Sequence, residues 1–183
     1  SAPLGDAKDL AALAACDLVV TCQGGDYTKA VYAPLREQGW QGLWIDAASA
    51  LRMEEDSVIV LDPVNRPMID RALTDGIRTF VGGNCTVSLL LMALQGLFDR
   101  GWVEWVSTMT YQSASGAGAK NMKELVTQMA VLGKAAGEAA ANPSVGALEV
   151  DRMVTDELRG GSLPQDEFGA PLAASLLPWI DRA

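Results

Sequence analysis

The residues most suited to chemistry lie at positions 82–88, in the segment GGNCTVS, where a cysteine follows two glycines and an asparagine. Cys85 stands between a short apolar stretch, 79–81, and an amphipathic stretch that begins near Thr86 or Val87. This pattern predicts a strand, a tight turn and a helix with Cys85 at its N-terminus. A thiol attacks as the thiolate, and the unpaired N–H groups and dipole of a helix N-terminus stabilise that anion. Cys85 is therefore a candidate nucleophile.

The neighbours of this thiol and the other cysteines have alternative interpretations. Asn84 offers a neutral donor for an oxyanion or a bound phosphate, but GGNC also fits a plain turn with a capping asparagine and a packed thiol. Cys16 and Cys22 have no CxxC spacing and no histidine with which to form a zinc site. We expect both to be reduced, small buried side chains beside a Val/Leu-rich strand, and we predict no metal site.

The chain contains no histidine. Histidine is the side chain that most often moves protons near neutral pH, so a mechanism confined to these residues must do without it. A thiol hydrolase of the papain type is disfavoured, because its cysteine needs a histidine partner.

Composition narrows the possible partners. The 183 residues are 49% hydrophobic and 20% charged, the balance of a soluble globular protein with one domain or parts of two. A net charge of −9 without a Lys/Arg cluster argues against nucleic acid as a partner. No apolar run is long enough to span a membrane and no secretory signal is present, so we expect a cytoplasmic protein.

The elements that must position Cys85 alternate along the first half of the chain. Short apolar stretches predict buried strands at 18–21, 43–46, 58–61 and 79–81, and helical spacing predicts helices at 6–15, 27–38 and 68–74. This alternation predicts an α/β fold with a parallel sheet and ligand sites at the carboxyl ends of its strands. Farther on, 102–112 predicts a strand of a second layer or domain, 121–141 predicts a helix, and 142–183 has only weak patterning with turns.

Six ordered blocks resemble the bacterial aspartate-semialdehyde dehydrogenases and extend the argument to the whole chain. They are TCQGGDY at 21–27, WIDAASALRM at 44–53, LDPVN at 61–65, GGNCTVSLLLMALQGLF at 82–98, YQSASGAGA at 111–119 and FGAPLAASLLPWID at 168–181. The resemblance implies the reversible, NADP-dependent conversion of L-aspartate 4-semialdehyde and inorganic phosphate to 4-aspartyl phosphate, in the biosynthesis of lysine, threonine and methionine through diaminopimelate. It also implies a thioester intermediate.

Matches to the family motifs assign roles to individual residues. They make Cys85 the acyl carrier, Gln112 the catalytic amide that orients substrate, and Arg52 the phosphate-binding arginine, a residue type suited to bidentate contacts. Asn84 belongs to the same substrate and phosphate site. Read without the family, Arg52 is a surface charge, Gln112 a strand-end amide, and Pro143 a helix terminator. The cofactor contacts implied by the match are Gln23, Ser115, Gly116, Ala117, Gly118, Ala119 and Pro143.

The resemblance also predicts the domain organisation. Residues 1–84 match part of a Rossmann-type NADP-binding domain without its first strand and glycine loop, and residues 85–183 match part of an α+β catalytic and dimerisation domain. The family's histidine and substrate-carboxylate arginine would lie beyond the chain, so we expect an incomplete form with little activity alone that forms a homo-oligomer. Two alternatives remain: a non-catalytic, enzyme-derived interaction domain, and a related phosphorylating dehydrogenase such as N-acetyl-glutamyl-phosphate reductase or a glyceraldehyde-phosphate-type enzyme.

Overall fold

The computed structural model describes residues 4–178. They divide into two compact units after Thr108. The helix that begins at Cys85 falls within the first unit, whereas the sequence places a domain boundary between residues 84 and 85. That boundary stays a prediction, and each unit is described by itself.

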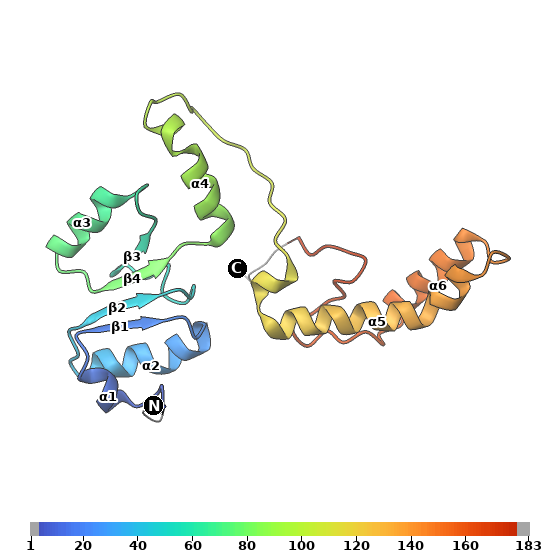
Figure 1. Ribbon diagram of the computed structural model, residues 1–183, viewed down its shortest axis with the longest axis horizontal. Helices are drawn as coiled ribbons and strands as arrows, with labels where there is room; N and C mark the ends of the chain where they lie inside the picture. Colours follow the sequence, from blue (N-terminus) through green and yellow to red (C-terminus); the bar gives the residue numbers. More distant parts are fainter. Residues whose placement is uncertain (1–3, 179–183) are drawn as a thin grey trace. The chain divides into compact units, whose positions relative to one another are not determined.

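The first unit is built on a four-stranded parallel sheet (Figure 1). Its strands are β1 (Leu18–Thr21), β2 (Leu43–Asp46), β3 (Ser57–Val60) and β4 (Thr79–Gly82), in the spatial order β1-β2-β4-β3. The helices are α1 (Leu10–Ala14), α2 (Gly25–Glu37), α3 (Arg66–Thr74) and α4 (Cys85–Phe98). The predicted α/β class with a parallel sheet is confirmed.

The core of this unit lies between α2 and one face of β1 and β2. Val19 pairs in register with Trp44, and both pack with Val31 and Leu35 from α2. Trp44 and Leu35 are fully buried. Because alternate residues of a strand point to opposite faces, Val20 and Ile45 fall on the other face, where they are 64% and 40% exposed.

Gly42 immediately precedes β2 and has no room for a side chain. A Cβ there would overlap the ring of Trp40 and lie 2.7 Å from the Asp17 carbonyl oxygen. Trp40 cannot withdraw freely, because it is buried and its Nε1 donates to the Cys16 carbonyl at 2.7 Å.

We therefore expect Gly42→Ala to lower the free energy of unfolding by about 1–3 kcal/mol through overpacking. Urea denaturation of the chain measures this loss. Gly137→Ala is the control, since nothing lies within 4 Å of a Cβ at that position in a helix of the second unit. Equal stability of the two variants would contradict the overlap.

The predicted strand at 102–112 is wrong. The structure contains no strand in that range, which Figure 1 shows as a long connection after α4. The residues alternate as a strand would, but a strand needs a neighbour to complete its hydrogen-bond ladder, and no described segment pairs with this one. Its aromatic side chains are accordingly exposed, Trp105 by 78% and Tyr111 by 83%.

The second unit is helical in its described part. It contains a 3-10 turn at Ala114–Ala117 (η1), a long helix α5 (Ala119–Ala141) and the helix α6 (Ala147–Arg159), which packs against α5. The helix predicted at 121–141 matches α5 to within two residues at its start, whereas no helix was predicted at α6. Two buried polar residues of α5, Glu124 and Gln128, accept hydrogen bonds from the backbone of the segment 167–173.

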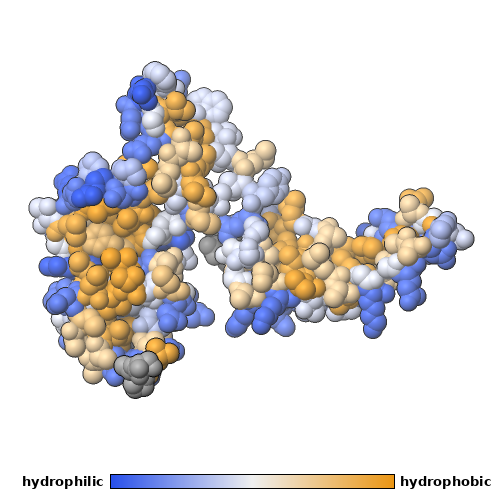
Figure 2. All heavy atoms as spheres, in the orientation of Figure 1, coloured by the Kyte–Doolittle hydropathy of each residue, from blue (hydrophilic) through white to orange (hydrophobic). Residues whose placement is uncertain are grey.

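Hydrophobic side chains remain exposed along α4, as the orange surface in Figure 2 shows. Val87 and Leu89 are 50% and 69% exposed, and no residue of α4 is buried. Even so, none of the helices in residues 4–178 has the length and apolar character needed to cross a membrane.

Candidate active site

Cys85 lies at the N-terminus of a helix, as the sequence predicts, and α4 begins at Cys85 itself rather than near Thr86 or Val87. It follows the turn Gly83–Asn84 that leaves the carboxyl end of β4, and its side chain is exposed. The sulfur lies 3.9 Å from the Thr86 hydroxyl oxygen. The thiol is thus accessible at a helix N-terminus beyond the carboxyl edge of a parallel sheet, which is the edge where such folds bind ligands.

Asn84 is the N-cap of α4. Its Oδ1 accepts the backbone N–H groups of Thr86 and Val87, both at 3.1 Å, and its φ and ψ of −61° and 132° are those of an extended cap residue. The capping alternative is therefore present in the structure. The cap uses the amide oxygen, so a donor role for Nδ2 toward substrate stays a prediction.

Asn84→Ala is expected to destabilise the chain by about 1 kcal/mol, because two helix N–H groups lose their acceptor. Asn84→Ser should retain most of the stability, since serine caps helices almost as well. Denaturant midpoints of the two variants against the wild type measure the cap alone. A serine variant as unstable as the alanine variant would show that the Asn84 oxygen is not what holds the turn.

Arg52 reaches this turn from the loop after β2. Its Nε donates to the Gly82 carbonyl at 2.7 Å and its Nη2 donates to the Gly83 carbonyl at 3.1 Å. The side chain is half-buried, so the interpretation of Arg52 as a plain surface charge is wrong. The contacts bring Arg52 into the same site as Asn84 and Cys85.

The loop that carries Arg52 is anchored to the core by Asp46, the last residue of β2. The Asp46 carboxylate is 1% exposed and accepts hydrogen bonds from the Thr28 hydroxyl at 2.5 Å and the Trp44 indole at 3.3 Å. Its other oxygen accepts the Ala48 N–H at 2.7 Å. Asp46 therefore fixes the first residues of the loop against α2 and the sheet.

Gln23 lies at the carboxyl end of β1, and its backbone N–H donates to the Thr21 hydroxyl at 3.2 Å. Gly24 then adopts a φ of +91°, a conformation that glycine permits, and α2 begins at Gly25 without a side-chain cap. The first turn of α2 thus presents uncapped N–H groups at the edge where Cys85 also lies. Asp26 in this turn adds negative charge, which favours a ribose hydroxyl or carboxamide there over a phosphate.

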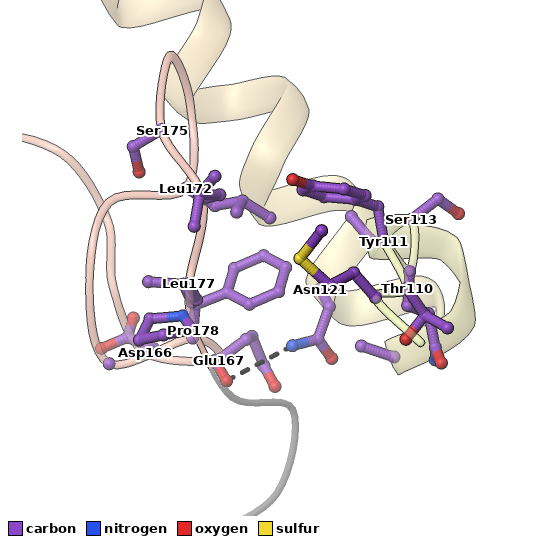
Figure 3. A pocket seen from close by; sticks show the side chains of 17 residues that line it. Thr110, Tyr111, Ser113, Asn121, Asp166, Glu167, Leu172, Ser175, Leu177 and Pro178 are labelled. Carbon is purple, nitrogen blue, oxygen red and sulfur yellow. Dashed lines mark hydrogen bonds between the residues drawn. The ribbon is translucent and has the colours of Figure 1, made fainter. Parts of the chain in front are cut away.

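Gln112 and the small-residue loop after it lie together in the second unit. The Gln112 side chain packs over Gly116, where an added Cβ would come within 2.6 Å of its Nε2. Figure 3 shows the pocket that Gln112, Ser113, Ala114 and Ala117 line together with residues of the 166–178 segment. The contact between Gln112 and the Ser115–Ala119 loop is therefore local to this unit.

Pro143 lies apart from that loop. The loop precedes α5 and Pro143 follows it, and at 1.5 Å per residue the 23-residue helix separates them by about 35 Å. Pro143 comes after the last turn of α5 and occupies the helix-terminating position that its alternative interpretation describes. Its cofactor contact stays a prediction.

Other residues at these sites were not found by sequence reasoning. In the pocket beside Gln112, Asn121 donates through Nδ2 to the Glu167 carbonyl at 3.3 Å, drawn as a dashed line in Figure 3. The signal that could have found Asn121 is a polar residue in the first turn of a helix that follows a glycine-rich loop. For Asp46, the signal in the sequence was a polar residue at the end of a predicted strand. Within residues 4–178, acidic and cysteine side chains do not gather into a metal-binding cluster.

The expectation that Cys16 and Cys22 are buried is wrong, because both side chains are exposed. Both lie outside β1, which spans Leu18–Thr21. Cys16 donates weakly through its sulfur to the Ala12 carbonyl at 3.5 Å. All three thiols are thus accessible, and reagent access alone does not distinguish Cys85.

Two family models match the chain. Residues 2–72 match the model described as semialdehyde dehydrogenase, NAD binding domain, which is a nicotinamide-cofactor module. Residues 94–183 match the model described as semialdehyde dehydrogenase, dimerisation domain. The chain belongs to the semialdehyde dehydrogenase family, a family of oxidoreductases.

One solved structure supports this assignment, and a second shares the fold. Aspartate semialdehyde dehydrogenase from Francisella tularensis is 43% identical, with a TM-score of 0.85 over 98% of this chain and 48% of its own. Aspartate semialdehyde dehydrogenase II from Vibrio cholerae is 24% identical and shares the fold, with a TM-score of 0.60 over 90% of this chain and 41% of its own. The chain thus spans about half the length of these relatives. The resemblance drawn from the six sequence blocks is confirmed.

Proposed function

We propose that this chain carries the acyl-accepting thiol and part of the cofactor site of an NADP-dependent aspartate-semialdehyde dehydrogenase. Its substrates are L-aspartate 4-semialdehyde and inorganic phosphate, its product is 4-aspartyl phosphate, and it serves the biosynthesis of lysine, threonine and methionine. The observation that carries the proposal is the exposed thiol of Cys85 at the start of α4. The 43% identity to the Francisella enzyme supports the choice of substrate.

The thiolate of Cys85 adds to the aldehyde carbon and forms the carbon–sulfur bond of the intermediate. NADP, when bound, would supply the acceptor for the hydride that leaves this carbon. Phosphate then attacks the thioester carbonyl, the carbon–sulfur bond breaks, and Cys85 returns as thiolate. Arg52 binds the phosphate, Asn84 offers Nδ2 to the carbonyl oxygen, and Gln112 orients the substrate.

The residues present fit a nicotinamide cofactor at the first unit. Uncapped N–H groups of α2 and the open approach to Gly24, where nothing lies within 4 Å of a Cβ, suit a polar flat group. Gln23 would hold the cofactor there, and the match to the family motifs assigns cofactor contacts to Ser115–Ala119 as well. We infer a cytoplasmic homo-oligomer joined through the dimerisation domain, with residues 1–84 and 85–183 as the functional parts.

The acyl half of the reaction tests this function on the chain itself. Incubation with 4-aspartyl phosphate should place one aspartyl group on the peptide that contains Cys85 and release inorganic phosphate. N-Acetyl-glutamyl phosphate in a parallel sample tests the related dehydrogenase, and faster labelling by that compound would contradict the aspartyl assignment. Absence of any acylation of a folded sample would contradict the proposed chemistry.

Assembly without chemistry is a second candidate function. The exposure of α4 favours it, because apolar side chains such as Leu89 gain most from burial against another chain. The same acylation experiment separates the two, since a domain kept only for assembly has no reason to react faster at Cys85 than at Cys16 or Cys22.

A further inference from the structure

The turn that presents Cys85 is short. Between the end of β4 at Gly82 and the start of α4 at Cys85 lie only Gly83 and Asn84. The planar guanidinium of Arg52 donates hydrogen bonds to the carbonyl oxygens of Gly82 and Gly83, so it contacts both the last residue of β4 and the first residue of the turn.

Gly83 leaves room for its neighbours but also weakens the turn. A Cβ at Gly83 would lie 2.5 Å from the Ser88 hydroxyl oxygen, which would have to rotate away, and 3.4 Å from the Ile59 Cγ2. Two successive glycines give the backbone more conformational freedom than other residues. Without an added tie, the direction in which α4 and its first thiol leave the sheet would be poorly fixed.

Arg52 is well placed to supply that tie because its own backbone is held. Its N–H donates to the Ser49 carbonyl at 3.1 Å, within the loop that Asp46 anchors through the Ala48 N–H. This pair of hydrogen bonds also requires arginine rather than lysine. Nε and Nη2 lie on one edge of the guanidinium and bind two successive carbonyls, which a single ammonium group cannot match.

We propose that Arg52 is a positioning residue for Cys85: its contacts with Gly82 and Gly83 fix the strand-to-helix turn that presents the thiol. This role needs no phosphate and adds to the anion-binding role proposed for the same residue. The two bonds use one N–H of Nε and one of Nη2 and do not involve Nη1, so one side chain can hold the turn and an anion together. The inference rests on the proposed role of Cys85 as the nucleophile.

The test is the rate of iodoacetamide alkylation of each cysteine in the whole chain, followed by peptide mass spectrometry. It is carried out in phosphate-free buffer from about pH 6 to about pH 9, a range that spans thiol ionisation. The variants are Arg52→Ala, Arg52→Lys and, as a control, Arg71→Ala, which removes an arginine whose side chain is 84% exposed on α3. Circular dichroism shows which samples are folded.

In the wild-type chain we expect Cys85 to react faster than Cys16 and Cys22. Both Arg52→Ala and Arg52→Lys should slow the alkylation of Cys85 about tenfold at each pH, the size expected for two lost hydrogen bonds. Cys16, Cys22 and the Arg71→Ala variant should keep wild-type rates, which excludes a general change of fold.

Three results would overturn the inference. Arg52→Lys at the wild-type rate with Arg52→Ala slowed would show that positive charge alone acts on the thiol. Wild-type rates in both variants would show that the carbonyl contacts do not affect Cys85, and a change shared by Cys16 and Cys22 would show a global effect. Equal reactivity of the three cysteines in the wild type is a different failure, because it removes the proposed nucleophile itself.

Discussion

Cys85→Ala is expected to abolish the acylation of the chain by 4-aspartyl phosphate. The thiolate attacks the acyl carbon, a carbon–sulfur bond forms, and the bond from that carbon to the phosphate oxygen breaks to release inorganic phosphate. Alanine offers no atom for this bond. Mass spectrometry of the intact chain should show the aspartyl adduct in the wild type and none above background in the variant.

Loss of the adduct in this variant is a specific result, because the substitution leaves the fold intact. Cys85 is exposed, so removal of its sulfur opens no cavity, and alanine is the residue most favourable to a helix. The matched control is the double variant Cys16→Ala with Cys22→Ala, which removes the other exposed thiols and should acylate at the wild-type rate. Adduct retained in Cys85→Ala and lost in the control would assign the chemistry to a different cysteine.

Much of the first unit follows from local sequence signals. The strands β1 and β2 begin and end at the residues that their apolar stretches predict, Leu18–Thr21 and Leu43–Asp46, and β3 differs by one residue at each end. Parallel strands consist of such short apolar runs between turn residues, so local composition determines their bounds. The predicted burial of these strands holds for one face only, since Val20 and Ile45 on the other face of β1 and β2 are exposed. The start of α4 at Cys85 was predictable for the same reason, since Asn84 is a good N-cap and glycines precede it.

The second unit was less predictable because its pattern depends on neighbours distant in the chain. The alternation at 102–112 indicates a strand, yet a strand forms only with a partner, and none of the described residues supplies one. In contrast, α6 carried a readable signal that was missed: Val150, Met153 and Val154 have the spacing of one helix face. Gly146 before it and Gly160 after it mark its ends.

In the candidate site too, contacts between residues distant in the chain could not be predicted from the sequence. The type of Arg52 and its place in a family-like block suggested an anion contact, but its partners Gly82 and Gly83 lie 30 and 31 residues away. No local pattern encodes which carbonyls a long side chain will reach. Burial of Cys16 and Cys22 was likewise predicted from their neighbours in sequence, whereas their exposure depends on which segments of the folded chain lie over them.

Gln128→Ala is expected to produce the largest loss of stability in the second unit. Gln128 is fully buried on α5, and its Nε2 donates to the Pro164 carbonyl at 2.7 Å. Its Oε1 accepts the N–H groups of Leu172 and Ala173, both at 2.9 Å. Alanine would leave one carbonyl and two N–H groups unpaired, each costing about 1–3 kcal/mol, for a total on the order of 3 kcal/mol or more.

Lys134→Ala is the matched control for this variant, since it changes an exposed polar residue of α5 to alanine and alters helix propensity by a similar small amount. Denaturation of the two variants measures the loss of stability, and hydrogen exchange at Leu172 and Ala173 locates it. Faster exchange at these amides in Gln128→Ala alone would show that one amide side chain holds the segment to α5. Because Leu172 and Gln112 line the same pocket, the variant should also loosen the surroundings of the residue proposed to orient substrate. Unchanged exchange at Leu172 and Ala173 would mean that the neighbouring contacts of Glu124 hold the segment without Gln128.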